Sequence, residues 1–122
     1  MRKWLLIVPT VLLPGCGEPA TEADRTALTA IWLPDDGSGR NVEFKADGVF
    51  DYQYDRGYTL RLDWKLASKG RVALTSGNGV TVSCNYTITD ASLAIDNGSG
   101  AACVSPGVTP PSPMPTKFKR AG

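Results

Sequence analysis

The chain has 122 residues, with 13 Lys and Arg, 12 Asp and Glu and no histidine, for a net charge of +1. This balance argues against a nucleic-acid-binding protein, which would carry a clustered basic face. Histidine is the commonest acid–base group and a frequent zinc ligand, so its absence argues against an enzyme, a metal site or a cofactor.

The first fifteen residues form a short apolar segment behind two positive charges. Arg2 and Lys3 precede the apolar run Trp4 to Leu13, which has the length of the apolar region of a secretory signal. A membrane-spanning helix would need about 20 apolar residues. We therefore predict that residues 1–15 are a signal peptide.

The apolar run ends in Leu13-Pro14-Gly15-Cys16, which resembles the lipobox of bacterial lipoprotein signals. The resemblance implies attachment of diacylglycerol to Cys16, cleavage before it, and acylation of the new N-terminus. Two or more acyl chains give stable anchoring, whereas one gives only reversible binding. Gly17 stands where the family uses Asp for retention at the inner membrane, so the implied location is the outer membrane, facing the periplasm. An ordinary secretory signal with an incidental cysteine is the alternative.

Cys84 and Cys103 remain as a single pair if Cys16 carries lipid. In an oxidising compartment, an even pair of cysteines in a small domain is most often a disulfide. We therefore predict a disulfide between Cys84 and Cys103, with free or metal-bound thiols as the alternative.

Residues 16–27 are polar and lack apolar periodicity, which predicts a tether with at most a helical turn near its end. From Leu28 onward, apolar residues recur at every second position, as in strands with one buried face. This alternation places Tyr58, Val80 and Cys84 on the inward faces of their strands. Turns rich in glycine, asparagine and aspartate separate these runs. The predicted strands cover residues 28–33, 40–45, 49–54, 58–67, 71–76, 80–88, 92–96 and 101–104.

About eight short antiparallel strands predict an all-β domain over residues 28–104, a small meander closed into a barrel or folded into a sandwich. Closure would remove the exposed edges that recruit other chains. Residues 105–122 contain five prolines and no alternation. This segment is therefore predicted to be a disordered, proline-rich and basic tail.

Several core and turn residues recur at set spacings within the predicted domain. They are Ile31-Trp32, then Val42-x-Phe44-x-x-Asp47-Gly48-x-Phe50, then Leu62-x-Trp64, then Tyr86-x-Ile88 with Leu93. The pattern resembles the lipocalin-like domains of small bacterial lipoproteins over residues 28–104. The resemblance implies a meandering β-barrel and says little about activity, because most of these domains have no assigned function.

Five aromatic residues are candidates for lining a pocket for a hydrophobic ligand, as in lipocalins. They are Trp32, Tyr52, Tyr54, Trp64 and Tyr86. The alternative is a small barrel filled by its own side chains. The sequence leaves both possibilities open.

The acidic residues are the remaining candidates for chemistry. They are Asp47 and Asp55 in predicted turns, and Asp51 and Asp63 on the predicted polar face. The first two are expected to cap backbone amides, and the other two to pair with Arg61 or Lys65. The aspartate-rich loop at residues 35–39 lacks the ligand spacing of a calcium site. We therefore predict no catalytic residues and no metal ligands.

An anchor, a small β domain and no recognisable catalytic set predict a lipid-anchored, non-enzymatic binding or interaction module of the cell envelope. Its expected partners are the membrane, through Cys16, and an envelope protein. One alternative is a carrier of small hydrophobic ligands. Another is an inhibitor of a cell-wall hydrolase.

Overall fold

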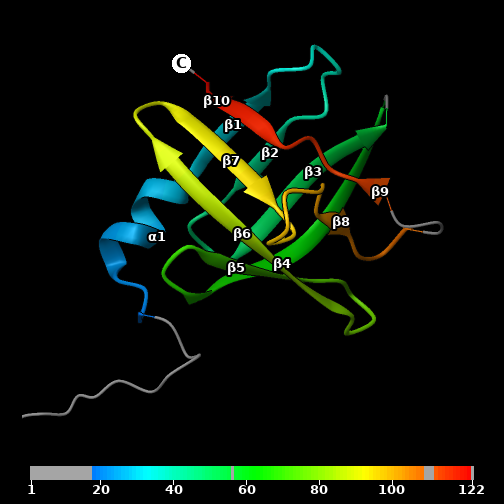
Figure 1. Ribbon diagram of the computed structural model, residues 1–122. Coiled ribbons are helices and arrows are strands. Elements are labelled where there is room, and N and C mark those ends of the chain that lie inside the picture. The colour runs from blue at the N-terminus through cyan, green and yellow to red at the C-terminus, as the bar shows by residue number, and fades with distance from the viewer. Residues whose placement is uncertain (1–17, 56, 109–111, 122) are drawn as a thin grey trace, which may run out of the picture.

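The computed structural model describes residues 18–55, 57–108 and 112–121 (Figure 1). The predicted signal peptide over residues 1–15 and the predicted lipidation site Cys16 lie outside these residues. Within the described ranges, no helix is long and apolar enough to cross a bilayer.

Eight antiparallel strands close into a barrel in the order β1-β10-β7-β6-β5-β4-β3-β2. This confirms the predicted all-β meander and shows that it forms a barrel rather than a sandwich. The barrel strands are β1 (Ala30–Pro34), β2 (Val42–Phe44), β3 (Val49–Asp55), β4 (Tyr58–Ser68), β5 (Arg71–Thr75), β6 (Thr81–Thr89), β7 (Ser92–Asp96) and β10 (Lys117–Arg120). A helix, α1 (Glu22–Leu28), precedes the barrel, and a separate two-stranded sheet pairs β8 (Val104–Ser105) with β9 (Ser112–Pro113). Seven of the eight predicted strands are found as barrel strands.

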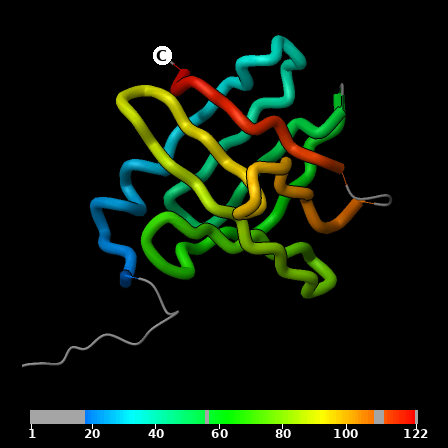
Figure 2. The backbone as a smooth tube through the Cα atoms, in the orientation of Figure 1, coloured from blue at the N-terminus to red at the C-terminus, as the bar shows by residue number. Residues whose placement is uncertain are grey.

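The prediction of a disordered tail over residues 105–122 is wrong for the described part of that segment. Lys117–Arg120 forms β10, which pairs with β1 on one side and β7 on the other (Figure 2). Phe118 on β10 is fully buried, as is Met114 just before it. A four-residue strand with a single buried side chain has no alternation that a sequence pattern could reveal. Because β10 supplies the closing strand, the predicted last strand over residues 101–104 lies outside the barrel.

The prediction of a polar tether over residues 16–27 is also wrong from Glu22 onward, because α1 is a two-turn helix that packs on the barrel. Thr21 caps it reciprocally: the Thr21 hydroxyl accepts from the Asp24 backbone N–H, and the Asp24 carboxylate accepts from the Thr21 N–H. Such a capping box satisfies two backbone donors that the first turn leaves unpaired. Leu28 at the other end of the helix is fully buried.

The up-and-down strand order gives the barrel two distinct ends. We call one the α1 end; it carries the β2–β3, β4–β5 and β6–β7 turns and the C-terminus of β10. We call the other the distal end; it carries the β1–β2, β3–β4 and β5–β6 turns and the long connection from β7 to β10, residues 97–116. In Figure 1, α1 lies on the left and the β8–β9 sheet on the right.

The predicted disulfide between Cys84 and Cys103 is confirmed, with 5.9 Å between the two Cα atoms. Cys84 is fully buried in the middle of β6, as its alternation predicted. Cys103 belongs to the long connection, so the bond attaches this connection to the barrel wall. Closing a loop of this length stabilises a folded chain by roughly 3 kcal/mol in the chain-entropy model.

The burial of Phe118 on β10 predicts that this residue stabilises the fold. We expect Phe118→Ala to lower the free energy of unfolding by about 3–5 kcal/mol, because it removes a fully buried aromatic ring from the closing strand. Urea denaturation followed by tryptophan fluorescence measures the change. Lys119→Ala, at the neighbouring exposed position, is the matched control and should change stability little. Equal, small effects of both substitutions would mean that the segment does not contribute a barrel strand.

Candidate functional site

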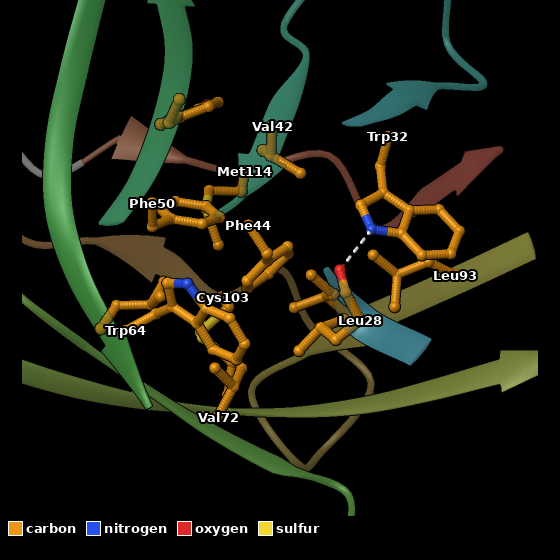
Figure 3. Close-up of a cluster of buried hydrophobic side chains, with 14 of the residues drawn as sticks. Leu28, Trp32, Val42, Phe44, Phe50, Trp64, Val72, Leu93, Cys103 and Met114 are labelled. Carbon is orange, nitrogen blue, oxygen red and sulfur yellow. Dashed lines mark hydrogen bonds between the residues drawn. A yellow bond between two sulfur atoms is a disulfide. The ribbon is translucent and has the colours of Figure 1, made fainter. Parts of the chain in front are cut away.

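Three of the five predicted ligand-lining aromatics lie in the packed core. Trp32 on β1, Tyr52 on β3 and Trp64 on β4 are at most 3% exposed. The indole N–H of Trp32 donates to the Leu28 carbonyl at 3.0 Å (Figure 3), and that of Trp64 donates to the Lys45 carbonyl at 2.9 Å. Buried indole N–H groups need such partners, and these bonds hold each ring in one place.

Contacts between rings fill the interior around Trp64. The ring centroid of Phe44 lies 4.7 Å from that of Phe50 and 5.2 Å from that of Trp64. Met114 from the long connection adds a further buried side chain to the same cluster (Figure 3). These contacts favour a barrel filled by its own side chains over a barrel with a central ligand pocket.

Helix α1 covers its end of the barrel through two arginines that stack on the core tryptophans. The Arg25 guanidinium lies 4.4 Å from the ring centroid of Trp64 and donates to the Ala46 carbonyl in the β2–β3 turn at 2.8 Å. The Arg120 guanidinium on β10 lies 4.9 Å from the ring centroid of Trp32 and donates to the Ala27 carbonyl of α1 at 3.1 Å. The helix is thereby attached to two sides of the barrel rim.

Tyr86, another predicted ligand-lining residue, lies beside α1 rather than with the core aromatics. It is half-buried and lines a shallow surface groove of about 350 Å³ together with Asp24 and Lys69. Burial raises the pKa of the Tyr86 hydroxyl above its ordinary value. Asp24 and Lys69 form an ion pair at 3.2 Å. A backbone hydrogen bond from Thr21, together with Lys69, lowers the pKa of Asp24.

The long connection covers the distal end. The Arg40 guanidinium donates to the Pro113 carbonyl at 2.9 Å and to the Tyr52 hydroxyl at 3.2 Å. Gly107, at φ +93°, lies so close to the barrel that a Cβ there would stand 3.3 Å from the Cβ of Ser76, which directly follows β5. The connection therefore packs tightly against the barrel mouth, and Gly107 permits this approach.

Tyr54, the last of the five aromatics, lines a groove of about 650 Å³ at the distal end. Arg40, Gln53 and Gly57 line the same groove, between the β1–β2 loop and the β3–β4 turn. The Tyr54 ring centroid lies 6.3 Å from that of Tyr52 and 6.4 Å from that of Tyr58. The three tyrosines thus form a row from the core to the surface.

Three exposed large apolar side chains lie at the distal end. Tyr58 is 62% exposed, Val80 50% and Val104 40%. Val80 and Val104 line a second groove, of about 290 Å³, beside the β5–β6 turn. In the described part of the chain, the other exposed large apolar residues are Ile31 and Leu33, on the outer face of β1.

The alternation predicted Tyr58 and Val80 to point inward, and this prediction is wrong. Both residues stand next to a turn at the distal end, where the chain passes beyond the core. Alternation alone does not mark where a strand leaves the core. An apolar residue directly after a glycine-containing turn, as at Gly57 and Gly79, is a signal that could have identified both as surface candidates.

The acidic residues form local pairs and caps, as expected for Asp47 and Asp51. Asp47 accepts from the Val49 backbone N–H at 3.1 Å. Asp51 accepts two hydrogen bonds from Arg61, at 2.8 and 3.0 Å, and pairs with Lys45 at 3.0 Å. These bonds, led by those from Arg61, lower the pKa of Asp51. A carboxylate held in this way is a structural anion rather than a proton carrier.

No group of three or more potential metal ligands occurs within residues 18–55, 57–108 and 112–121. Comparisons with protein-family models, with curated proteins and with solved structures found no match for this chain.

The Asp51 cluster predicts a pH dependence of stability. The lowered pKa in the folded state means that the charged carboxylate stabilises the fold above the unfolded value of about 3.9. This contribution is lost as the pH falls through the folded pKa. We expect Asp51→Asn to cost about 1 kcal/mol at pH 7, because Arg61 is largely exposed and its pair is screened by solvent.

Denaturant unfolding at pH 7 and at successively lower pH measures the effect. The gap between Asp51→Asn and the unmodified protein should close as the pH falls below 4. Asp63→Asn, at an exposed position on the neighbouring strand, is the control. A gap that does not change with pH would contradict the assigned role of the carboxylate.

Proposed function

We propose that this protein is a lipid-anchored lipoprotein of the bacterial outer membrane that acts as a non-enzymatic binding module in the periplasm. In this proposal, the distal end contacts a protein of the envelope. The observation that carries it is the exposure of Tyr58, Val80 and Val104 at the same end of a closed barrel. Two surface grooves lie at this end, one lined by Tyr54 and the other by Val80 and Val104. A contiguous exposed apolar patch rimmed by polar residues marks an interaction site in a soluble domain, and Val80 and Val104 line one groove together.

The anchor and location rest on two features of the cysteines. The sequence around Cys16 resembles a lipobox, and the remaining pair forms a disulfide. Disulfides persist in oxidising compartments such as the periplasm and are rare in the cytosol. Both features support export, and the closed antiparallel barrel supports the proposed relationship to lipocalin-like domains.

A protein partner fits the structure better than a small hydrophobic ligand carried inside the barrel. A carrier needs an enclosed apolar cavity that surrounds most of its ligand. Here the core aromatics contact one another, and α1 and the long connection cover the two ends. An inhibitor of a cell-wall hydrolase would be one case of a protein partner held at the distal end.

The anchor predicts that cells grown with labelled palmitate incorporate the label into this protein. Cys16→Ser should abolish incorporation and release the protein from the membrane fraction, because acylation requires the Cys16 sulfur. Gel analysis of labelled membranes checks both outcomes. A labelled Cys16→Ser protein, or an unlabelled and uncleaved parent, would reject the anchor.

The distal interaction surface predicts where crosslinks to a partner form in living cells. The photoreactive substitution Tyr58→benzoyl-phenylalanine should give a defined adduct, whereas the same replacement of Lys65, exposed on the same strand, should not. Mass spectrometry identifies the adduct. Binding of the purified partner should then weaken about tenfold in Tyr58→Ala, as at a moderate interface hot spot. Adducts from Lys65 alone would place the interface elsewhere.

A further inference from the structure

Glu18, two residues after the predicted lipidation site Cys16, is already hydrogen-bonded to the barrel. The Lys69 backbone N–H, in the β4–β5 turn, donates to the Glu18 carbonyl at 2.8 Å. The Lys69 ammonium also pairs with Asp24 of α1. Glu18 and the helix are therefore bound to the same turn at the α1 end, through the backbone and through an ion pair.

The rest of α1 is held equally closely, so the segment cannot act as a flexible spacer. Its capping box orders the first turn, Arg25 reaches the β2–β3 turn, and the Leu28 carbonyl accepts from the core indole of Trp32. A flexible twelve-residue tether would let the barrel adopt any orientation relative to the membrane. The contacts of α1 remove that freedom from residue 18 onward.

The covalent distance from the lipid to the barrel is therefore short. Only Gly17 separates Cys16 from Glu18. Two residue steps span at most about 7 Å between Cα atoms, even in a fully extended chain. If Cys16 carries the acyl chains, as the proposed function has it, this short connection keeps the glyceryl group close to the α1 end.

The chemistry of the α1 end suits lipid headgroups rather than acyl chains. Its exposed residues include Glu22 on the helix, Lys69 in the β4–β5 turn and Asp90 in the β6–β7 turn. Among the described residues, the exposed large apolar side chains lie at the distal end and on β1. A polar surface with both signs of charge can rest on phospholipid headgroups without entering the hydrocarbon.

We infer that the α1 end is the membrane-facing surface of this protein and that phospholipid headgroups are its partner. The barrel axis then runs along the membrane normal, and the distal grooves are directed into the periplasm. The 11-residue strand β4 runs from one end to the other, which at ~3.3 Å per residue and the usual barrel tilt raises the distal end by about 25–30 Å. This inference rests on the proposed anchor and adds the orientation of the domain on it.

A quenching experiment tests this orientation. The lipidated protein has no free thiol when Cys16 is acylated and Cys84 is bonded to Cys103, so one introduced cysteine takes a thiol-reactive bimane selectively. Ala23→Cys labels the α1 end, and Gly77→Cys labels the β5–β6 turn at the distal end; both positions are exposed. Each protein is reconstituted into phosphatidylethanolamine–phosphatidylglycerol vesicles that contain a phospholipid with a nitroxide on its headgroup.

We expect several-fold stronger quenching at position 23 than at position 77. Insertion of a long Gly-Ser linker between Gly17 and Glu18 should remove the difference, because the barrel can then rotate freely. Equal quenching of both labels without the linker, or stronger quenching at position 77, would overturn the orientation while leaving the anchor intact. Failure of the parent to bind vesicles any better than Cys16→Ser would instead reject the anchor, and the orientation with it.

Discussion

The pairing of the first barrel strand with the last is the constraint on which the rest of the structure depends. β1 and β10 come from opposite ends of the chain, and their hydrogen bonds join a meander into a closed cylinder. Arg120 strengthens the junction by stacking on Trp32 and by donating to the Ala27 carbonyl. The Arg120 side chain therefore links β10 to both β1 and α1. Because of this, barrel closure and helix docking both depend on Arg120.

The two ends of the barrel differ in how they are covered. At the α1 end, a short helix is held by arginine stacking, an ion pair and backbone hydrogen bonds, and its outer surface is polar. At the distal end, a long connection is attached by a disulfide and by Arg40, and apolar side chains remain exposed around it. This difference supports the proposal that the α1 end faces the membrane and the distal end binds a partner.

Much of the fold could be predicted from local pattern. Seven of the barrel strands and the inward position of Cys84 follow from alternation, because the pleat sends every second side chain to the same face. The Asp51–Arg61 pair could be predicted in the same way, since the two residues face each other on the outside of adjacent strands. The exposure of Tyr58 and Val80 was not predicted, because both residues continue the alternation and only their position directly after a glycine-containing turn sets them apart.

The sequence by itself was enough to predict a small all-β domain with one disulfide, because composition, cysteine number and the period of two can be read from local pattern. Only the tertiary structure decided that residues 117–120 close the barrel and that α1 is a cap rather than a tether. Both depend on contacts between distant parts of the chain. Phe118 can be recognised as a core residue only when β10 lies between β1 and β7. In the same way, α1 can be recognised as a cap only through its contacts with the barrel, such as the hydrogen bond from Arg120 to the Ala27 carbonyl.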